Sequence, residues 1–318
     1  MNRIDIRAAA ARLLEAGAVR ILAHNHPDGD TLGSAYALAH ALHALGKDVC
    51  VLCEDPVPAM FYYMRVGLTE TGREDPLVVS VDVAEESLLG GTLQKIYGGR
   101  VDLNIDHHGT NGLYAAENLI DARAAACAEL IGELIDAMGA QMTAHIAACL
   151  YAGISTDTGC FRYANTTARS HRWAARFMEL GVDTEPLDRA FFETETKTYL
   201  ALERMAFDSL RYCCGGRVAL VAVTQEMFRQ SGSNDEEYIK IVARTRQIEG
   251  VQVGVSIRER PDGSYKISLR SHAPVNAAAI AARMGGGGHP SAAAAVSKAG
   301  LEETIAAIVG YIEEALET

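Results

Sequence analysis

Apolar runs that end in acidic residues or histidines constrain this sequence most. Val19–Ala23 is followed by His24, Leu77–Val81 by Asp82, and Val101–Ile105 by Asp106, His107 and His108. Segments with helical patterning lie between these runs, and this alternation predicts a parallel α/β sheet with crossover connections. Because such sheets bind ligands beyond the carboxyl ends of their strands, we expect these side chains to meet at one edge.

The loop after the first run adds two carboxylates to its histidine. His24, Asp28 and Asp30 lie on one short turn before an apolar helical segment. Together they offer a nitrogen and several oxygens to a hard or borderline divalent cation. The alternative is a capping loop, in which Asp28 or Asp30 accepts hydrogen bonds from the first amides of the helix. The downstream carboxylates and histidines favour the metal site.

The composition limits the class of protein. With 318 residues, 49% of them hydrophobic, the chain is long enough for about two domains with a real core. Lys and Arg number 29 against 41 Asp and Glu, and the net charge of −12 argues against binding long duplex nucleic acid. The seven scattered cysteines are unlike a secreted disulfide framework. No apolar run reaches the ~20 residues of a membrane span and no signal peptide pattern is present, so we expect a cytoplasmic protein.

The pattern divides the chain into a larger α/β domain over residues 1–186, a connector over 187–212 and a smaller α/β domain over 213–318. Cys127–Met138 and Thr143–Ile154 have helical patterning, and Asp157 lies in the polar turn Ser155–Gly159 that follows. Residues 186–212 are expected to form one long charged helix. The alanine-rich helix Cys127–Met138 is a candidate dimer interface.

The smaller domain carries a second polar constellation. Pro261-Asp262-Gly263 predicts the turn of a hairpin whose second strand presents Ser268, Arg270 and Ser271. A glycine run, Gly285–Gly288, precedes His289 and lies between alanines that we expect to be helical. Glycines let the backbone approach an anion closely, and an arginine fork suits phosphate. A flexible linker is the alternative interpretation of the glycine run.

The strand-end residues are too numerous for a single zinc ion, which takes four ligands. Four aspartates crowded without metal would repel one another or become protonated. Two cations that share a bridging carboxylate satisfy this set, and paired ions are a common device for phosphoryl hydrolysis. Mixed imidazole and oxygen ligands favour Mn²⁺ before Mg²⁺ or Co²⁺, with zinc less suited. The set is His24, Asp28, Asp30, Asp82, His107, His108 and Asp157.

These motifs resemble those of the DHH phosphoesterase (RecJ-like) superfamily. His24-x-x-x-Asp28-x-Asp30, the lone Asp82, Asp106-His107-His108 and the Asp157 turn match its four motifs in order. Gly286-Gly287-Gly288-His289 resembles the signature of its DHH-associated C-terminal domain, although Ala294 stands where that pattern has glycine. The resemblance covers essentially the whole chain and is greatest to the NrnA type, the bifunctional oligoribonucleases and pAp (3′-phosphoadenosine 5′-phosphate) phosphatases.

The resemblance implies a role for each residue. His24 and Asp28 would hold one metal, Asp30, His107 and Asp157 the other, and Asp82 would bridge both. Asp106 would orient His107, and His108 would face the phosphate and either stabilise or protonate the leaving oxygen. Substrate contacts would come from the smaller domain, through Ser268, Arg270, Ser271, Gly286, Gly287, Gly288 and His289.

The implied activity is manganese-dependent hydrolysis of short RNA and of pAp, by attack of hydroxide on phosphorus. Substrates would bind in a cleft between the two domains, and members of the family are often dimers. Hydrolysis of cyclic di-AMP or linear pApA is the nearest alternative, because it uses the same metals. A catalytically silent nucleotide sensor is a rival of another class, but it predicts loss of at least one ligand and none is missing. A DNA exonuclease of the RecJ kind is disfavoured by the short chain.

Overall fold

The computed structural model describes residues 2–68 and 75–317. The chain forms two compact units, Met1–Thr194 and Glu195–Thr318. Within the described ranges, none of the helices has the length and apolar character that crossing a membrane requires.

The first unit is built on a parallel sheet of six strands in the order β1-β6-β5-β4-β2-β3. Every pairing in it is parallel, which confirms the predicted α/β class. The three strands whose ends carry the expected site residues, β5, β4 and β2, are neighbours at its centre. Its strands are β1 (Asn2–Arg3), β2 (Ala18–Leu22), β3 (Asp48–Leu52), β4 (Leu77–Val81), β5 (Leu103–Asp106) and β6 (Glu117–Ile120).

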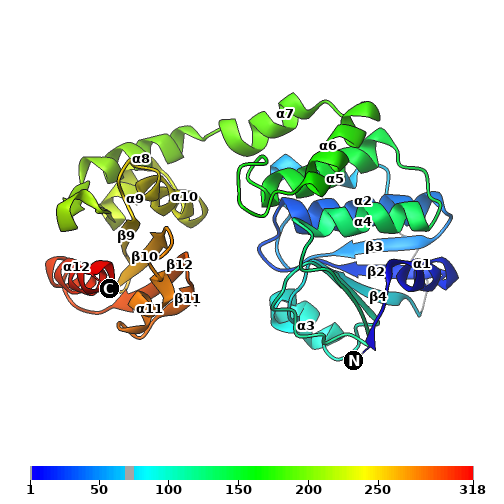
Figure 1. Ribbon diagram of the computed structural model, residues 1–318, viewed down its shortest axis with the longest axis horizontal. Helices are drawn as coiled ribbons and strands as arrows, with labels where there is room; N and C mark the ends of the chain where they lie inside the picture. The colour runs from blue at the N-terminus through cyan, green and yellow to red at the C-terminus, as the bar shows by residue number, and fades with distance from the viewer. Residues whose placement is uncertain (1, 69–74, 318) are drawn as a thin grey trace. The chain divides into compact units, whose positions relative to one another are not determined.

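Helices cover both faces of this sheet (Figure 1). Alternate strand residues point to opposite faces: Ile21 and Val79 belong to the main core, while Leu22 and Val78 pack in a second cluster with Leu93. The main core lies under α2, α4 and α5, and the second cluster lies under α3. The helices of this unit are α1 (Ile6–Glu15), α2 (Gly29–Ala44), α3 (Gly91–Tyr97), α4 (Cys127–Ala137), α5 (Ala144–Asp157) and α6 (Ala168–Glu179).

Helix α4 is not free to serve as a partner surface. Its apolar residues, including Leu130, Ile131 and Leu134, are buried. They pack against α1, α2, α5 and α6 of the same unit. The prediction that this helix forms a dimer interface is therefore wrong, and a homodimer would have to use another surface.

The connector is broken, so the prediction of one long helix is wrong. A short helix α7 (Thr184–Asp188) runs into a π-helical turn (Arg189–Glu193), and α8 (Lys197–Asp208) starts afresh. Thr196 is the N-cap of α8, with extended backbone and a hydroxyl that accepts from the amide of Tyr199 at 2.9 Å. Threonine side chains that cap a helix compete with continuation of the preceding one, which explains the break.

The second unit contains a mixed sheet of six strands in the order β11-β12-β10-β9-β8-β7. The predicted hairpin is confirmed as β9 and β10, which pair antiparallel. The strands are β7 (Arg211–Cys213), β8 (Val218–Val223), β9 (Val253–Glu259), β10 (Tyr265–Ser271), β11 (Gly287–His289) and β12 (Ala292–Ser297). The helices besides α8 are α9 (Gln225–Ser231), α10 (Asp235–Arg246), α11 (Ala277–Ala282) and α12 (Leu301–Glu317).

The alanines after the glycine run form strand β12, not a helix as predicted. Ala293 and Ala295 alternate inward and are buried. A Cβ on Gly286 would lie 2.1 Å from the carbonyl oxygen of Ala294. Pairing with β11 and β10 on its two sides thus overrides the high helix propensity of alanine.

Candidate metal centre

Three neighbouring strands deliver histidines and aspartates to one edge of the parallel sheet. His24 follows β2, Asp82 follows β4 directly, and Asp106 ends β5 before His107 and His108. Asp82 has φ of +60°, a left-handed conformation that costs energy for a residue with a side chain. Its amide donates to the carbonyl of Ile105 at 2.9 Å, so the neighbouring strand holds this turn in place.

The N-terminus of α2 positions the two aspartates of the first loop. Asp28 is the N-cap, and its Oδ1 accepts from the amides of Asp30 and Thr31, both at 3.0 Å. The hydroxyl of Thr31 donates to the carbonyl of Val81, the residue before Asp82, at 3.2 Å. The capping alternative is therefore confirmed for Asp28, and the cap itself brings this carboxylate beside the strand ends.

Asp30 is fully buried and faces the start of a second helix. Its oxygens accept from the amides of Cys127 at 2.6 Å and Ala128 at 2.9 Å, at the N-terminus of α4, and from the hydroxyl of Ser34 at 3.1 Å. The positive end of a helix dipole favours a carboxylate there. Burial nevertheless raises the pKa of Asp30 above its ordinary value. No side-chain pattern in the sequence marks this support, because every residue except proline carries a backbone N–H.

Asp157 is the last residue of α5, not part of a turn as predicted. Close packing of α5 against α2 brings it to the site. A Cβ on Gly33 would lie 2.3 Å from the carbonyl oxygen of Cys149, and one on Gly153 would lie 2.7 Å from Oδ1 of Asp30. Both glycines are therefore required for the two helices to approach this closely.

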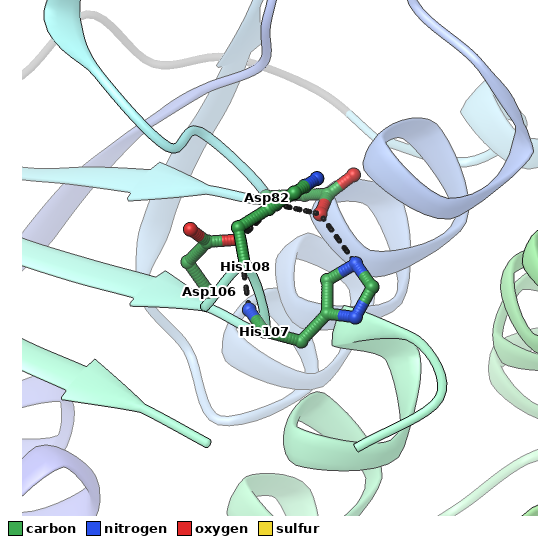
Figure 2. Close-up of side chains that lie close together, drawn as sticks. All are labelled: Asp82, Asp106, His107 and His108. Carbon is green, nitrogen blue, oxygen red and sulfur yellow. Dashed lines mark hydrogen bonds and ion pairs between the residues drawn. The ribbon is translucent and has the colours of Figure 1, made fainter. Parts of the chain in front are cut away.

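These side chains gather into three groups that overlap at Asp82 and His107, and one of the three consists of Asp82, Asp106, His107 and His108. Potential ligand atoms of His24, Asp28 and Asp82 lie within 4.8 Å of one another, as do those of Asp30, His107 and Asp157. Nε2 of His107 is 3.4 Å from Oδ2 of Asp157 and 3.5 Å from Oδ1 of Asp82. Figure 2 shows the ring of His107 turned toward the carboxylate of Asp82. The topology predicted this meeting of residues distant in sequence.

The carboxylates of this cluster favour protons in the absence of another cation. Burial, and then the charge of Asp30, raises the pKa of Asp82 well above its usual range. The same two causes raise the pKa of Asp157 to about 9. Oδ1 of Asp82 is buried and accepts no hydrogen bond from the residues described. Buried charges are paired or bind metals, so this acidic cluster could bind metal ions.

The carboxylate of Asp106 is hydrogen-bonded to a different histidine ring from the one expected. Its Oδ1 accepts from Nδ1 of His108 at 2.7 Å and from the backbone amide of His107 at 2.8 Å. Nδ1 of His107 instead lies 3.2 Å from the carbonyl oxygen of Ala124. The prediction that Asp106 orients the ring of His107 is therefore wrong, because its carboxylate holds the ring of His108 (Figure 2).

The same hydrogen bonds set the ionisation of Asp106 and His108. Burial alone would raise the pKa of Asp106, but hydrogen bonds from His108 and Asn111 outweigh it and lower this pKa. The hydrogen bond to Asp106 raises the pKa of His108 in turn. Asn111 was not among the predicted residues, although it lies only three positions after His108.

A separate pocket of about 350 Å³ lies in the second unit. Of the predicted substrate residues it contains Ser268, Arg270, Gly287 and Gly288. Burial, and then the charge of Arg246, lowers the pKa of Arg270, and among the described residues this arginine forms no ion pair. Residues that the sequence analysis did not single out for substrate binding complete the lining: Tyr238, Ile239, Val242, Lys266, Ala292, Ala293 and Ala294.

Three predicted substrate residues lie outside this lining. Ser271 is on the opposite face of β10 from Ser268 and Arg270, and its hydroxyl donates to the carbonyl of Val275 at 2.8 Å. Gly286 packs against Ala294 and Ala295. His289 is exposed at the end of β11. The two-residue period of a strand separates Ser271 from its neighbours, a distinction that the sequence analysis did not draw.

Comparison with known proteins agrees with this arrangement. Residues 18–154 match the model of the DHH family, N-terminal domain, and residues 216–318 match that of the DHHA1 domain. The bifunctional oligoribonuclease and PAP phosphatase NrnA of Thermus thermophilus is 34% identical, over 96% of this chain and 93% of its own length. The cyclic-di-AMP phosphodiesterase PdeA of Listeria monocytogenes is 25% identical over 92% of this chain, which spans 46% of that protein.

A solved structure shares the fold along nearly the whole chain. An exopolyphosphatase-related protein from Bacteroides fragilis superposes with a TM-score of 0.85 at 23% identity, over 98% of this chain and 95% of the other. The two family models cover both units, and the Thermus relative extends across them. The chain therefore belongs to the DHH phosphoesterase family, in the group of hydrolases that includes the NrnA proteins.

Proposed function

We propose that this enzyme hydrolyses short oligoribonucleotides to mononucleotides and converts pAp to AMP. Its Thermus relative is named a bifunctional oligoribonuclease and PAP phosphatase. The observation that carries the proposal is the position of Asp82. Its Oδ2 lies 3.7 Å from Nε2 of His24 and its Oδ1 lies 3.5 Å from Nε2 of His107. A carboxylate that faces two separate ligand groups suits a pair of cations.

The residues present fit two divalent ions. His24 and Asp28 would hold one, Asp30, His107 and Asp157 the other, and Asp82 would contact both. The mixture of imidazole nitrogen and carboxylate oxygen suits Mn²⁺, with Mg²⁺ or Co²⁺ as substitutes. Such ions, when bound, lower the pKa of water and offset the charge that develops on the phosphate. The buried Oδ1 of Asp82, which accepts no hydrogen bond from the described residues, supports this assignment.

His108 would act on the leaving group. Its Nδ1 is fixed by Asp106, and the side chain is 43% exposed, so Nε2 is open to a substrate. In the proposed step a water molecule releases one proton to solvent, its oxygen bonds to phosphorus, and the bond from phosphorus to the ribose oxygen breaks. That ribose oxygen takes up a proton from Nε2 of His108. General acid assistance of this kind typically contributes about 10²–10⁴-fold to the rate.

The pocket of the second unit would hold one nucleotide of the substrate. Arg270 and Lys266 supply positive charge, and the glycine backbone at Gly287 leaves room for close approach of an anion. Ile239 and Val242 of α10 offer an apolar wall for a base. A pocket of about 350 Å³ suits a single nucleotide better than a longer strand, which supports short substrates.

The test uses the purified chain with Mn²⁺ and four substrates: pAp, an RNA dinucleotide, linear pApA and cyclic di-AMP. We expect hydrolysis of the first two, and Asp82→Ala should abolish it. Asp55→Asn is the matched control, because Asp55 binds His26 in the adjacent loop and lies outside both ligand groups. Hydrolysis that persists in Asp82→Ala would exclude the proposed centre.

The panel also separates the alternatives. Preference for cyclic di-AMP would instead assign the activity named for the Listeria relative, whereas preference for pApA would assign a phosphodiesterase specific for this linear dinucleotide. A nucleotide sensor without catalysis would bind pAp yet leave all four substrates intact. Elemental analysis at saturating Mn²⁺ adds a measurement independent of turnover, with two ions expected per chain and less than one favouring the sensor.

A further inference from the structure

Asn111 makes four hydrogen bonds immediately behind the DHH motif. Its Nδ2 donates to Oδ2 of Asp106 at 2.6 Å and to the carbonyl of Val83 at 3.3 Å. Its Oδ1 accepts from the amide of Leu113 at 2.7 Å, and its own amide donates to the carbonyl of His108 at 3.1 Å. The side chain is thereby fixed to the end of strand β4 on one side and to the loop after β5 on the other.

The carboxylate of Asp106 depends on this amide for its orientation. The side chain of Asp106 is fully buried. Its Oδ1 is occupied by Nδ1 of His108 and the amide of His107. Among the described residues, Asn111 is the group that donates to Oδ2. Removal of this donor would leave a buried carboxylate oxygen without a partner and free the carboxylate plane to rotate.

We propose that Asn111 is a positioning residue, which fixes the plane of Asp106 and through it the direction in which Nε2 of His108 points. This inference rests on the proposed function, since it needs His108 to donate a proton to the leaving oxygen. An amide is suited to the position because it donates without adding charge beside a buried carboxylate. An aspartate at position 111 would instead place a second carboxylate against the buried carboxylate of Asp106.

The test compares two substrates that differ in the leaving group. One is an RNA dinucleotide, whose departing ribose oxygen needs a proton. The other is the p-nitrophenyl ester of a nucleoside 5′-phosphate, whose departing nitrophenolate does not. For Asn111→Ala we expect kcat on the dinucleotide to fall roughly tenfold to hundredfold, part of the full contribution of a general acid. KM, and kcat on the nitrophenyl ester, should stay within about threefold of the wild-type values.

Tyr114→Phe is the matched control. The Tyr114 hydroxyl donates to the same Val83 carbonyl and to Oγ of Ser80, but not to Asp106. This variant removes a buried hydrogen bond close to Asp106. The ratio of kcat on the dinucleotide to kcat on the nitrophenyl ester should stay unchanged. An equal loss of kcat on both substrates in Asn111→Ala would show a merely structural role and overturn the proposal.

A double-mutant cycle covers the case in which Asn111→Ala folds poorly, using Asn111→Ser as the milder change. In a His108→Ala background, the substitution at position 111 should cause no further loss of kcat on the dinucleotide. Additive losses would contradict the proposal. If wild-type protein hydrolyses neither substrate, the proposed function itself fails, and this outcome is distinct from any result that concerns Asn111.

Discussion

The carboxylate oxygens of Asp82 face different imidazoles: Oδ2 lies 3.7 Å from Nε2 of His24, and Oδ1 lies 3.5 Å from Nε2 of His107. This residue belongs to the ligand group of His24 and Asp28, and it also faces His107 of the group that contains Asp30 and Asp157. Its backbone adopts a left-handed conformation, with φ of +60°, directly after the end of β4. Asp82 is thus the residue whose loss should affect both groups together.

The number of Mn²⁺ ions that bind to each variant tests whether Asp82 is shared by both metal sites. We expect Asp82→Asn to weaken binding of both ions, because each loses a shared ligand. Asp28→Asn should weaken one ion only, since Asp28 belongs to the group with His24. Calorimetric titration of the metal-free protein with Mn²⁺ would show two sites in the wild type and one strong site in Asp28→Asn. Two unaltered sites in Asp82→Asn would contradict the shared role.

The stability of the metal-free protein should fall as pH rises. Burial, followed by the charge of Asp30, raises the pKa of Asp157 to about 9, so the folded state retains a proton that the unfolded chain has released. This contribution is fully present below about pH 4, the ordinary pKa of an aspartate, and is lost as pH rises through about 9. Between these two pKa values this one group lowers the unfolding free energy by about 1.4 kcal/mol per pH unit.

Melting temperatures between pH 6 and pH 9 measure this effect. The metal-free wild type should melt at a lower temperature at the higher pH, and added Mn²⁺ should stabilise it more there, because a bound cation removes the repulsion. Asp157→Asn, which cannot ionise, should show a shallower dependence. A wild-type melting temperature that rises over this range would disprove the prediction.

Gly153→Ala should damage the centre through packing alone. The added Cβ would lie 2.7 Å from both Oδ1 of Asp30 and Cβ of Ala128, so α5 must move away from α2. We expect a loss of about 1–3 kcal/mol in unfolding free energy, as for other overpacked cores, together with reduced hydrolysis. Gly310→Ala in α12 is the control, since nothing lies within 4 Å of its added Cβ. Denaturant unfolding of both variants should show loss only for Gly153→Ala.

Arg270→Ala should impair substrate binding more than turnover. The guanidinium lines the pocket of the second unit and forms no ion pair with the residues described, so its charge is available to a phosphate. Loss of a charge-assisted hydrogen bond of about 1.5–3 kcal/mol predicts a KM for pAp roughly tenfold to hundredfold higher. Arg260→Ala, at the exposed hairpin turn, should leave KM unchanged. Equal KM values in both variants would show that Arg270 does not contact the substrate.

Much of this architecture was predictable because it follows from residue type and spacing. Apolar runs ending at His24, Asp82 and Asp106 implied parallel strands with a common edge, and the structure places β2, β4 and β5 side by side. The hairpin of β9 and β10 followed from the turn chemistry of Pro261 and Gly263. In each case the local sequence pattern is compatible with a single low-energy structure.

Other features depended on groups that the sequence does not distinguish. The amides of Cys127 and Ala128 hold Asp30, and the carbonyl of Ala124 meets His107, but every residue carries an amide and a carbonyl. The alanines of β12 were expected to be helical because propensity was weighed without their partners in the sheet. Long-range pairing decides such segments, and one sequence alone does not reveal it.

Helix α7 is tied to the centre by Asp188. Its carboxylate accepts from the hydroxyl of Tyr151 at 2.7 Å and from that of Ser155 at 2.8 Å, two residues before Asp157. An isolated first unit that stops after α6 would therefore lose the hydrogen bonds that Asp188 makes to α5. Anyone who separates the two halves of this protein for study should keep the chain through Asp188.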